Sequence, residues 1–306
     1  MRAHPGALFL AMAMATAMAT ATACGGGDDD GGVDPSGDGG VDGGGGGDGP
    51  GVDAAPTGGC GTTRPTGVQN GTIQVGGVDR TYVLFVPAGY DPQTPTPLVF
   101  AWHGRTGTAA GARGYFGIEA AAAGAAIIVY PQGLPVSAEP SDTGWELAGN
   151  GRDLAFYDAL AERLRATYCI GSSYSLGHSF GGYMSNAVAC HRGGTGPGQV
   201  RAIAPVAGGG PFGACPGDPV AAVIIHGMTD AVVPFSQGES SRDVWRAEAG
   251  CATTSTAIDP APCVVYDGCP AGRSVRFCAH GETAFQGHGW PAWAAAAAWR
   301  LFQATP

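Results

Sequence analysis

The sequence predicts an α/β fold, with a mainly parallel central sheet, helices on both faces and disulfide bonds that cross-link the domain. Short apolar runs alternate with helix-compatible segments, as in proteins built from β-α-β units. Several of these runs are apolar at every position, which is expected of strands covered on both faces. After residue 59 the chain holds eight of its 9 cysteines, an even number that fits four disulfides in an exported domain.

The first part of this region predicts three strands, each a short apolar run that ends at a proline or a glycine-containing loop. They cover residues 81–86, 98–102 and 127–130. An alanine-rich stretch, residues 120–126, has helical propensity, although Gly124 interrupts it. This part therefore supplies strands to the sheet and a short helix before the third strand.

The second part continues the alternation. Strands are expected at residues 173–176, 202–206 and 221–225, and helices at residues 153–167, 180–190, 236–249 and 293–302. Residues 153–167 carry apolar side chains at helical spacing, which indicates one buried face. Residues 251–278 hold four cysteines and are expected to be irregular or short-stranded. Eight cysteines allow 105 pairings, so the connectivity stays open.

Three regions follow one another along the chain. Residues 1–24 have the character of a signal peptide, and Ala21-Thr22-Ala23 fits a signal-peptidase site. The same residues before Cys24 resemble a bacterial lipobox, so Cys24 is a candidate for a lipid anchor. Residues 25–59 are mainly Gly and Asp and bury too little apolar surface to fold, which predicts a disordered tether. Residues 60–306 form the expected catalytic domain.

The formal net charge of −10 belongs mostly to the tether, because eight Asp lie within residues 25–59 and leave about −2 elsewhere. The predicted domain is therefore nearly neutral and carries no basic patch. Nucleic acid is not expected as a partner. The domain is expected to be a monomer that lies outside the cell or on a bacterial cell surface.

The candidate nucleophile is Ser179 in the sequence Gly177-His178-Ser179-Phe180-Gly181. This G-x-S-x-G pattern occurs by chance in a glycine-rich chain, and a turn serine is the alternative. Its context favours catalysis, because an apolar strand runs in and a helix-compatible segment runs out. A sharp strand-to-helix turn would push the serine above the sheet, and small residues on either side would permit that turn.

A serine hydroxyl needs a base, and the base needs a carboxylate to orient it. Asp230 follows the expected strand at residues 221–225, and His288 lies between two glycines before the last helix. The order Ser, Asp, His along the chain is the one found in hydrolases whose serine lies on such a strand-to-helix turn. His280 is the alternative base, and a turn-forming role is the alternative for Asp230.

The oxyanion of the tetrahedral intermediate requires two backbone donors. We expect one from Phe180, the residue after the nucleophile. The loop after residues 98–102 should supply the other, from Arg105 or, as second choice, from Thr106. His103 is expected to hydrogen-bond this loop. His178 and His226 also lie near strand ends and are expected to be structural.

Six motifs in one order between Cys60 and Phe302 resemble those of the feruloyl esterase and polyhydroxybutyrate depolymerase family of carbohydrate esterases. The motifs are Trp102-His103-Gly104-Arg105, Tyr130-Pro131-Gln132-Gly133, Tyr168-Cys169-Ile170, residues 177–186, His226-Gly227-x-x-Asp230 and Gly287-His288-x-Trp290-Pro291. The resemblance implies the α/β-hydrolase fold and a triad of Ser179, Asp230 and His288. It also implies that no metal or organic cofactor is needed.

These features predict a secreted serine carboxylic-ester hydrolase that cleaves acyl esters of plant polysaccharide. The alternative is a polyhydroxybutyrate depolymerase, and weaker alternatives are a peptidase of the same fold or a non-catalytic surface binding module. Trp145, Trp290 and Tyr115 are candidates for an aromatic wall of the substrate site, with core packing as the other interpretation.

Overall fold

The computed structural model describes residues 58–305 of the 306-residue chain. The predicted signal peptide, the lipidation at Cys24 and nearly all of the predicted tether lie outside the described residues. Within the described residues, none of the helices has the length and apolar character needed to span a membrane.

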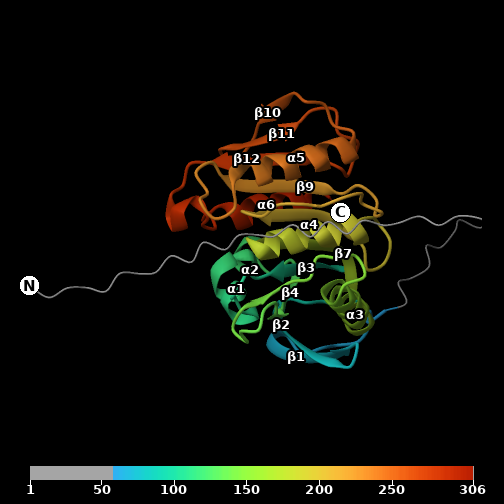
Figure 1. The fold of residues 1–306 in the computed structure, drawn as a ribbon. Coiled ribbons are helices and arrows are strands. Elements are labelled where there is room, and N and C mark those ends of the chain that lie inside the picture. The colour runs from blue at the N-terminus through green and yellow to red at the C-terminus, as the bar shows by residue number, and fades with distance from the viewer. Residues whose placement is uncertain (1–57, 306) are drawn as a thin grey trace, which may run out of the picture. The chain divides into compact units, whose positions relative to one another are not determined.

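A ten-stranded sheet forms the centre of the fold, with strand order β1-β2-β4-β3-β7-β8-β9-β12-β11-β10. Figure 1 shows this order from β1 at the bottom of the view to β10 at the top. The strands are β1 (Gly67–Val75), β2 (Val78–Val86), β3 (Thr96–Trp102), β4 (Ile127–Pro131), β7 (Ile170–His178), β8 (Val200–Val206), β9 (Ala221–Gly227), β10 (Ser255–Ala257), β11 (Cys263–Tyr266) and β12 (Val275–His280). The six from β4 to β12 pair in parallel, which confirms the predicted α/β-hydrolase sheet.

Helices cover both faces of this sheet. They are α1 (Ala109–Phe116), α2 (Ile118–Ala122), α3 (Arg152–Thr167), α4 (Phe180–Arg192), α5 (Phe235–Ala249) and α6 (Ala294–Gln303). The side chains of β3 alternate between two cores. Leu98, Phe100 and Trp102 belong to the core that includes α3, α4 and α5, and Val99 and Ala101 to the core that includes α1, α2 and α6. This alternation explains why the strand is apolar at every position.

Three details differ from the prediction. The helix expected at residues 120–126 is α2, which ends at Ala122 because Ala123 adopts a φ of 48° and turns the chain toward β4. The strand expected at residues 173–176 is the longer β7. The sequence patterns missed β1, α1 and the parallel strand β12, whereas the short β10 and β11 agree with the expectation for the cysteine-rich segment.

All eight cysteines of the described region form disulfides, as their even number predicted. The pairs are Cys60–Cys169, Cys190–Cys215, Cys251–Cys269 and Cys263–Cys278. A native disulfide typically contributes about 2–4 kcal/mol to stability. Four such bonds are typical of a domain that folds in an oxidising, extracytoplasmic compartment.

Candidate active site

The turn that joins β7 to α4 presents Ser179 in a strained conformation, with φ 56° and ψ −120°. Neither neighbouring glycine has room for a side chain. A Cβ at Gly177 would lie 2.2 Å from the carbonyl oxygen of Gly181, and a Cβ at Gly181 would lie 1.9 Å from that of Trp102. The two glycines therefore permit the sharp strand-to-helix turn that the sequence context predicted.

Ser179, His288 and Asp230 form one chain of hydrogen bonds. The Ser179 Oγ lies 2.8 Å from the His288 Nε2, and the His288 Nδ1 lies 2.7 Å from the Asp230 Oδ2. The other carboxylate oxygen accepts the N–H groups of Val232 and Val233, each at 2.8 Å. These two bonds orient the carboxylate toward the imidazole. The three residues follow the carboxyl ends of β7, β9 and β12.

His280, the alternative base, lies apart from this chain of hydrogen bonds. It ends β12, and neither of its ring nitrogens has a hydrogen-bond partner among the described residues. Its ring instead makes an edge contact with Trp293, at a centroid distance of 5.9 Å. Of the two histidines that follow Asp230, the structure therefore brings His288 to the serine.

Two further histidines border the site. The His178 Nε2–H donates to the carbonyl oxygen of His288 at 2.7 Å, and the His226 Nε2–H donates to that of Val233 at 3.0 Å. Burial and, to a smaller extent, the nearby His288 lower the pKa of His178 to about 4. Burial also lowers the pKa of His226, whose Nε2 lies 3.4 Å from the Asp230 carboxylate. Both rings are therefore neutral near pH 7.

The loop after β3 lies against the serine, since a Cβ at Gly104 would be 3.4 Å from the Ser179 Cβ. His103 holds this loop, as expected, because its Nδ1–H donates to the Gly104 carbonyl at 2.7 Å. The N–H of Thr106, the second choice as oxyanion donor, is used by the carbonyl oxygen of Thr143 at 2.8 Å. The backbone N–H of Arg105, the first choice from the sequence, stays our prediction for this loop.

An ion pair that the sequence did not reveal anchors this loop. The Arg105 Nε and Nη2 donate to the two carboxylate oxygens of Asp142 at 2.6 and 2.7 Å. These hydrogen bonds lower the pKa of Asp142 to about 2. The carboxylate is therefore charged at any pH above about 4, and the pair is lost only as the pH falls through about 2. Asp142 lies 37 residues further along the chain, too far for a local signal.

We predict that Asp142→Asn lowers kcat about tenfold at pH 7, because a displaced catalytic group loses rate steeply with distance. The difference from the wild type should persist down to about pH 4 and shrink only nearer pH 2, where the wild-type carboxylate is protonated. The matched control is Asp158→Asn, which removes a similar two-bond pair with Arg192. An equal loss of kcat in both variants would contradict a specific role for Asp142.

The three aromatic candidates divide into two groups. Trp145 is 2% exposed, and its Nε1–H donates to the His103 carbonyl at 2.8 Å, so it belongs to the core and not to an aromatic wall. Tyr115 is 42% exposed and accepts the N–H of Trp290 at 2.9 Å. Tyr115 also makes an edge contact with His178 at 5.7 Å. The structure thus places Tyr115 and Trp290, but not Trp145, against His178, the residue before Ser179.

Exposed apolar side chains, of which the sequence analysis singled out only Tyr115, follow the strands at this end of the sheet. Six of the eight large apolar residues that are exposed in the described region follow the carboxyl ends of β3, β4, β8, β9 or β12. They are Tyr115, Val136, Phe212, Met228, Val232 and Phe285. We call these six residues the apolar rim. Apolar residues in the segments that follow buried strands were the available signal.

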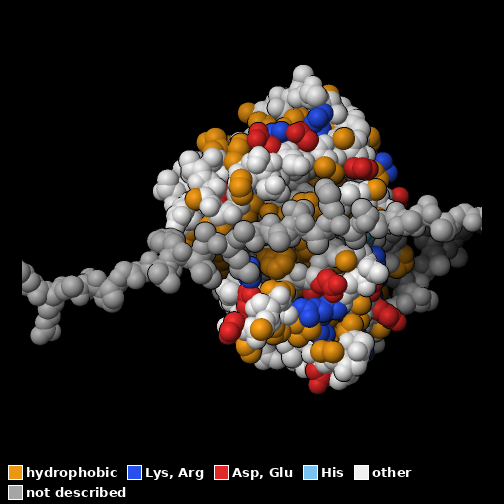
Figure 2. Space-filling model, viewed as in Figure 1, with side chains coloured by type: hydrophobic (Ala, Val, Ile, Leu, Met, Phe, Trp, Pro, Cys, Tyr) orange, Lys and Arg blue, Asp and Glu red, His pale blue; other side chains and the backbone are white. Residues whose placement is uncertain are grey.

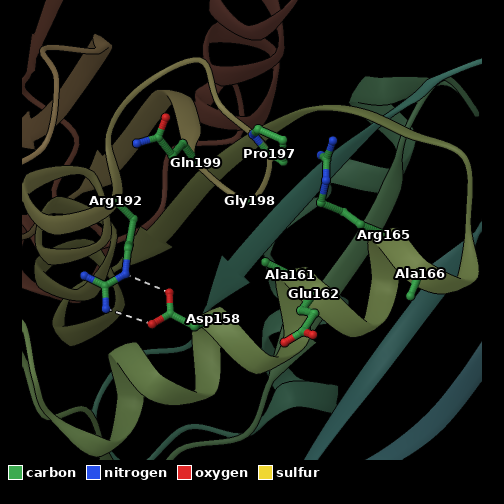
Figure 3. Close-up of a pocket in the computed structure, with 9 residues that line it drawn as sticks. All are labelled: Asp158, Ala161, Glu162, Arg165, Ala166, Arg192, Pro197, Gly198 and Gln199. Carbon is green, nitrogen blue, oxygen red and sulfur yellow. Dashed lines mark hydrogen bonds and ion pairs between the residues drawn. The ribbon is translucent and has the colours of Figure 1, made fainter. Parts of the chain in front are cut away.

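A cavity of about 440 Å³ lies elsewhere, between α3, the end of α4 and the turn before β8. Figure 3 shows its lining, including the ion pair of Arg192 with Asp158. This turn precedes β8, whereas Ser179 follows the carboxyl end of β7, so the cavity lies at the opposite end of the parallel strands.

On the face that Figure 2 shows, basic side chains lie close to acidic ones. In residues 58–305 no cluster of His, Cys, Asp and Glu is arranged to hold a metal ion.

Known proteins with curated functions resemble this chain over most of its length. Feruloyl esterase C of Emericella nidulans is 37% identical over 213 residues, which cover 66% of this chain and 73% of the relative. The chain belongs to the feruloyl esterase family. Feruloyl esterase D of Neurospora crassa is 32% identical over 251 residues, covering 74% of this esterase and 82% of the relative. Family membership makes the protein a carboxylic ester hydrolase.

Solved structures agree with the fold of this esterase. An acetyl xylan esterase from Aspergillus awamori has a TM-score of 0.54 at 16% identity, and the match covers 73% of this chain and 94% of that one. A ferulic acid esterase has a TM-score of 0.53 at 15% identity, and the match covers 78% of this chain and 97% of that one. At these identities the likeness concerns the α/β-hydrolase fold alone. A scan against protein-family models finds no match.

Proposed function

We propose that this esterase hydrolyses hydroxycinnamoyl esters of plant polysaccharide, with Ser179 as nucleophile, His288 as base and Asp230 as the orienting carboxylate. The observation that carries the proposal is the hydrogen-bonded chain from the serine hydroxyl through the imidazole to the carboxylate. A serine hydroxyl is a weak nucleophile until a base removes its proton, and this arrangement supplies that base.

In the proposed acylation the Ser179 Oγ attacks the ester carbonyl carbon while its proton passes to the His288 Nε2. The N–H groups of Phe180 and Arg105 hold the resulting oxyanion. The carbon–oxygen bond to the alcohol then breaks, and His288 returns the proton to the leaving oxygen. A water molecule next attacks the acyl-enzyme, again giving its proton to His288, and the acid leaves. Asp230 stabilises the imidazolium in both steps.

The substrate class rests on the relatives and on the aromatic groups near His288. The curated relatives are feruloyl esterases by name. Because His288 must reach the leaving oxygen, the alcohol part of the ester lies on the imidazole's side of Ser179. Tyr115 and Trp290 lie on that side and offer apolar surface to a sugar ring or an aromatic ring.

A second candidate is hydrolysis of a solid polyester such as polyhydroxybutyrate, and the apolar rim favours it. Phe212, which is 67% exposed and stacks on Tyr183, is one of its largest members. Apolar side chains grouped around a site mark a surface that meets an apolar partner. A polyester film is such a partner, whereas a polysaccharide offers mostly hydroxyl groups.

Parallel assays distinguish these two substrates. We predict that the enzyme releases ferulic acid from methyl ferulate and no soluble hydroxybutyrate from a polyhydroxybutyrate film, each measured by chromatography. The reverse result would support the polyester reading. Phe212→Ser would then lower film hydrolysis more than methyl ferulate hydrolysis, and Val78→Ser, an exposed apolar residue outside the rim, is the matched control.

We also propose that the mature enzyme is a monomer that acts outside the cell, without nucleic acid partners. A lipid on Cys24 would hold it at a bacterial cell surface through the Gly/Asp-rich segment. The disulfides support export, and the sequence before Cys24 supports either lipidation or free secretion. Mass spectrometry of the mature N-terminus distinguishes these two outcomes.

A further inference from the structure

Two hydrogen bonds hold the backbone at His288 and just after it, and neither takes part in the proposed reaction. The His178 Nε2–H donates to the carbonyl oxygen of His288 at 2.7 Å. Two residues later, the N–H of Trp290 donates to the Tyr115 hydroxyl at 2.9 Å. The segment that carries the imidazole is thus attached to the residue beside the nucleophile and to α1.

The segment needs such support because the backbone conformation just before His288 is energetically unfavourable. Phe285, Gln286 and Gly287 adopt φ values of 50°, 61° and 83°, three left-handed residues in succession. A non-glycine residue in this region costs roughly 1–3 kcal/mol and persists only where its surroundings hold it. Gly287 must be glycine here, since a Cβ would lie 2.8 Å from the Asp230 nitrogen. The backbone preferences of residues 285–287 therefore do not fix the position of His288.

Ring contacts reinforce the two hydrogen bonds. The rings of His178 and His288 lie 5.0 Å apart, and the edge of Tyr115 meets His178 at 5.7 Å. Trp290 stacks on Phe116 with a centroid distance of 4.4 Å. His178 precedes Ser179 directly, so one short peptide both presents the nucleophile and contacts the loop of the base.

We propose that His178 is a positioning residue for His288, and that Tyr115 assists it through Trp290. Together they keep the His288 Nε2 within hydrogen-bond distance of the Ser179 Oγ. This inference rests on the proposed function, because it takes Ser179 and His288 as the reacting pair.

The ionisation of His178 suits this role. Burial, together with the adjacent His288 and His226, lowers its pKa to about 4, although the hydrogen bond to the His288 carbonyl and the charge of Asp230 oppose this. A neutral ring with its proton on Nε2 donates the hydrogen bond without placing positive charge beside the imidazolium that forms on His288. Its contribution should therefore be the same at every pH above about 5.

The test replaces His178 in two ways. His178→Leu removes the donor and should lower kcat on a soluble ester about 10- to 100-fold, with KM within about twofold, because the base is displaced. His178→Gln keeps an N–H in reach of the same carbonyl and should restore kcat to within about fivefold of the wild type. His191→Leu is the matched control, a half-buried histidine roughly 18 Å further along α4 at 1.5 Å per residue.

Tyr115→Phe gives an independent measurement if His178→Leu does not fold. Loss of the hydroxyl should lower kcat about two- to fivefold without raising KM, and combined with His178→Leu its effect should not be additive. The inference is overturned if His178→Gln loses as much kcat as His178→Leu. It is equally overturned if Tyr115→Phe raises KM alone.

The rate at which a fluorophosphonate labels Ser179 separates this inference from the proposed function. Failure of the wild-type enzyme to react would overturn the function itself. Rapid labelling of the wild type together with equally rapid labelling of both His178 variants would overturn only the positioning role. Slow labelling confined to His178→Leu would support it.

Discussion

Ser179→Ala is expected to lower kcat for ester hydrolysis by about 10⁶-fold, by analogy with triad replacements in other serine hydrolases. The variant loses the atom that attacks the ester, whereas His288 and Asp230 keep their hydrogen bond. Because alanine also lacks a group for acylation, no fluorophosphonate label should be found on the protein. Initial rates on methyl ferulate and intact-mass spectrometry give the two measurements.

The control for this prediction is Ser240→Ala, an exposed serine on α5 that should retain wild-type kcat. Circular dichroism and thermal unfolding should show the same fold in both variants. If Ser179→Ala retained more than about a tenth of the wild-type rate, Ser179 would not be the nucleophile, and the proposed mechanism would fail.

Arg80→Met is expected to lower the free energy of unfolding by about 3–5 kcal/mol, because it leaves a buried carboxylate without its cation. The Arg80 Nη2 lies 2.5 Å from the Asp153 Oδ1, and the two side chains are 1% and 0% exposed. The guanidinium also lies over the ring of Phe156 at 4.1 Å. Urea titrations of the oxidised proteins measure the change.

The double variant Arg80→Met with Asp153→Leu should recover much of this loss, since no charge then remains buried. Arg152→Met is the matched control. Its guanidinium is 42% exposed and 3.6 Å from Asp153, so its removal should change the free energy by less than about 1 kcal/mol. A loss below about 1 kcal/mol in Arg80→Met would show that the buried pair contributes little.

This ion pair is connected to the candidate site through hydrogen bonds between side chains and backbone groups. The second Asp153 oxygen accepts the N–H of Glu146 at 2.7 Å, next to Trp145, which in turn donates to the His103 carbonyl. The loop after β3 therefore rests on a buried polar network, because its own residues lack an apolar face to pack. Arg80→Met is expected to lower kcat as well as stability for this reason.

The sequence by itself determined those features that depend on neighbouring residues. The alternation of apolar runs predicted the parallel sheet, and the even cysteine number predicted four disulfides. Glycines at 177 and 181 marked the strand-to-helix turn, since the close approach of backbone there excludes any side chain. The order of Ser179, Asp230 and His288 selected the three side chains that the structure brings together.

Only the tertiary structure decided the features that depend on residues distant in the chain. A tryptophan has the same apolar surface in a core or in a substrate site, so the burial of Trp145 could not be read locally. Whether Thr106 has a free N–H depends on Thr143, and the support of His288 depends on His178, 110 residues earlier. Hydrogen bonds across such separations follow from how the strands pack side by side, which no local pattern of residues specifies.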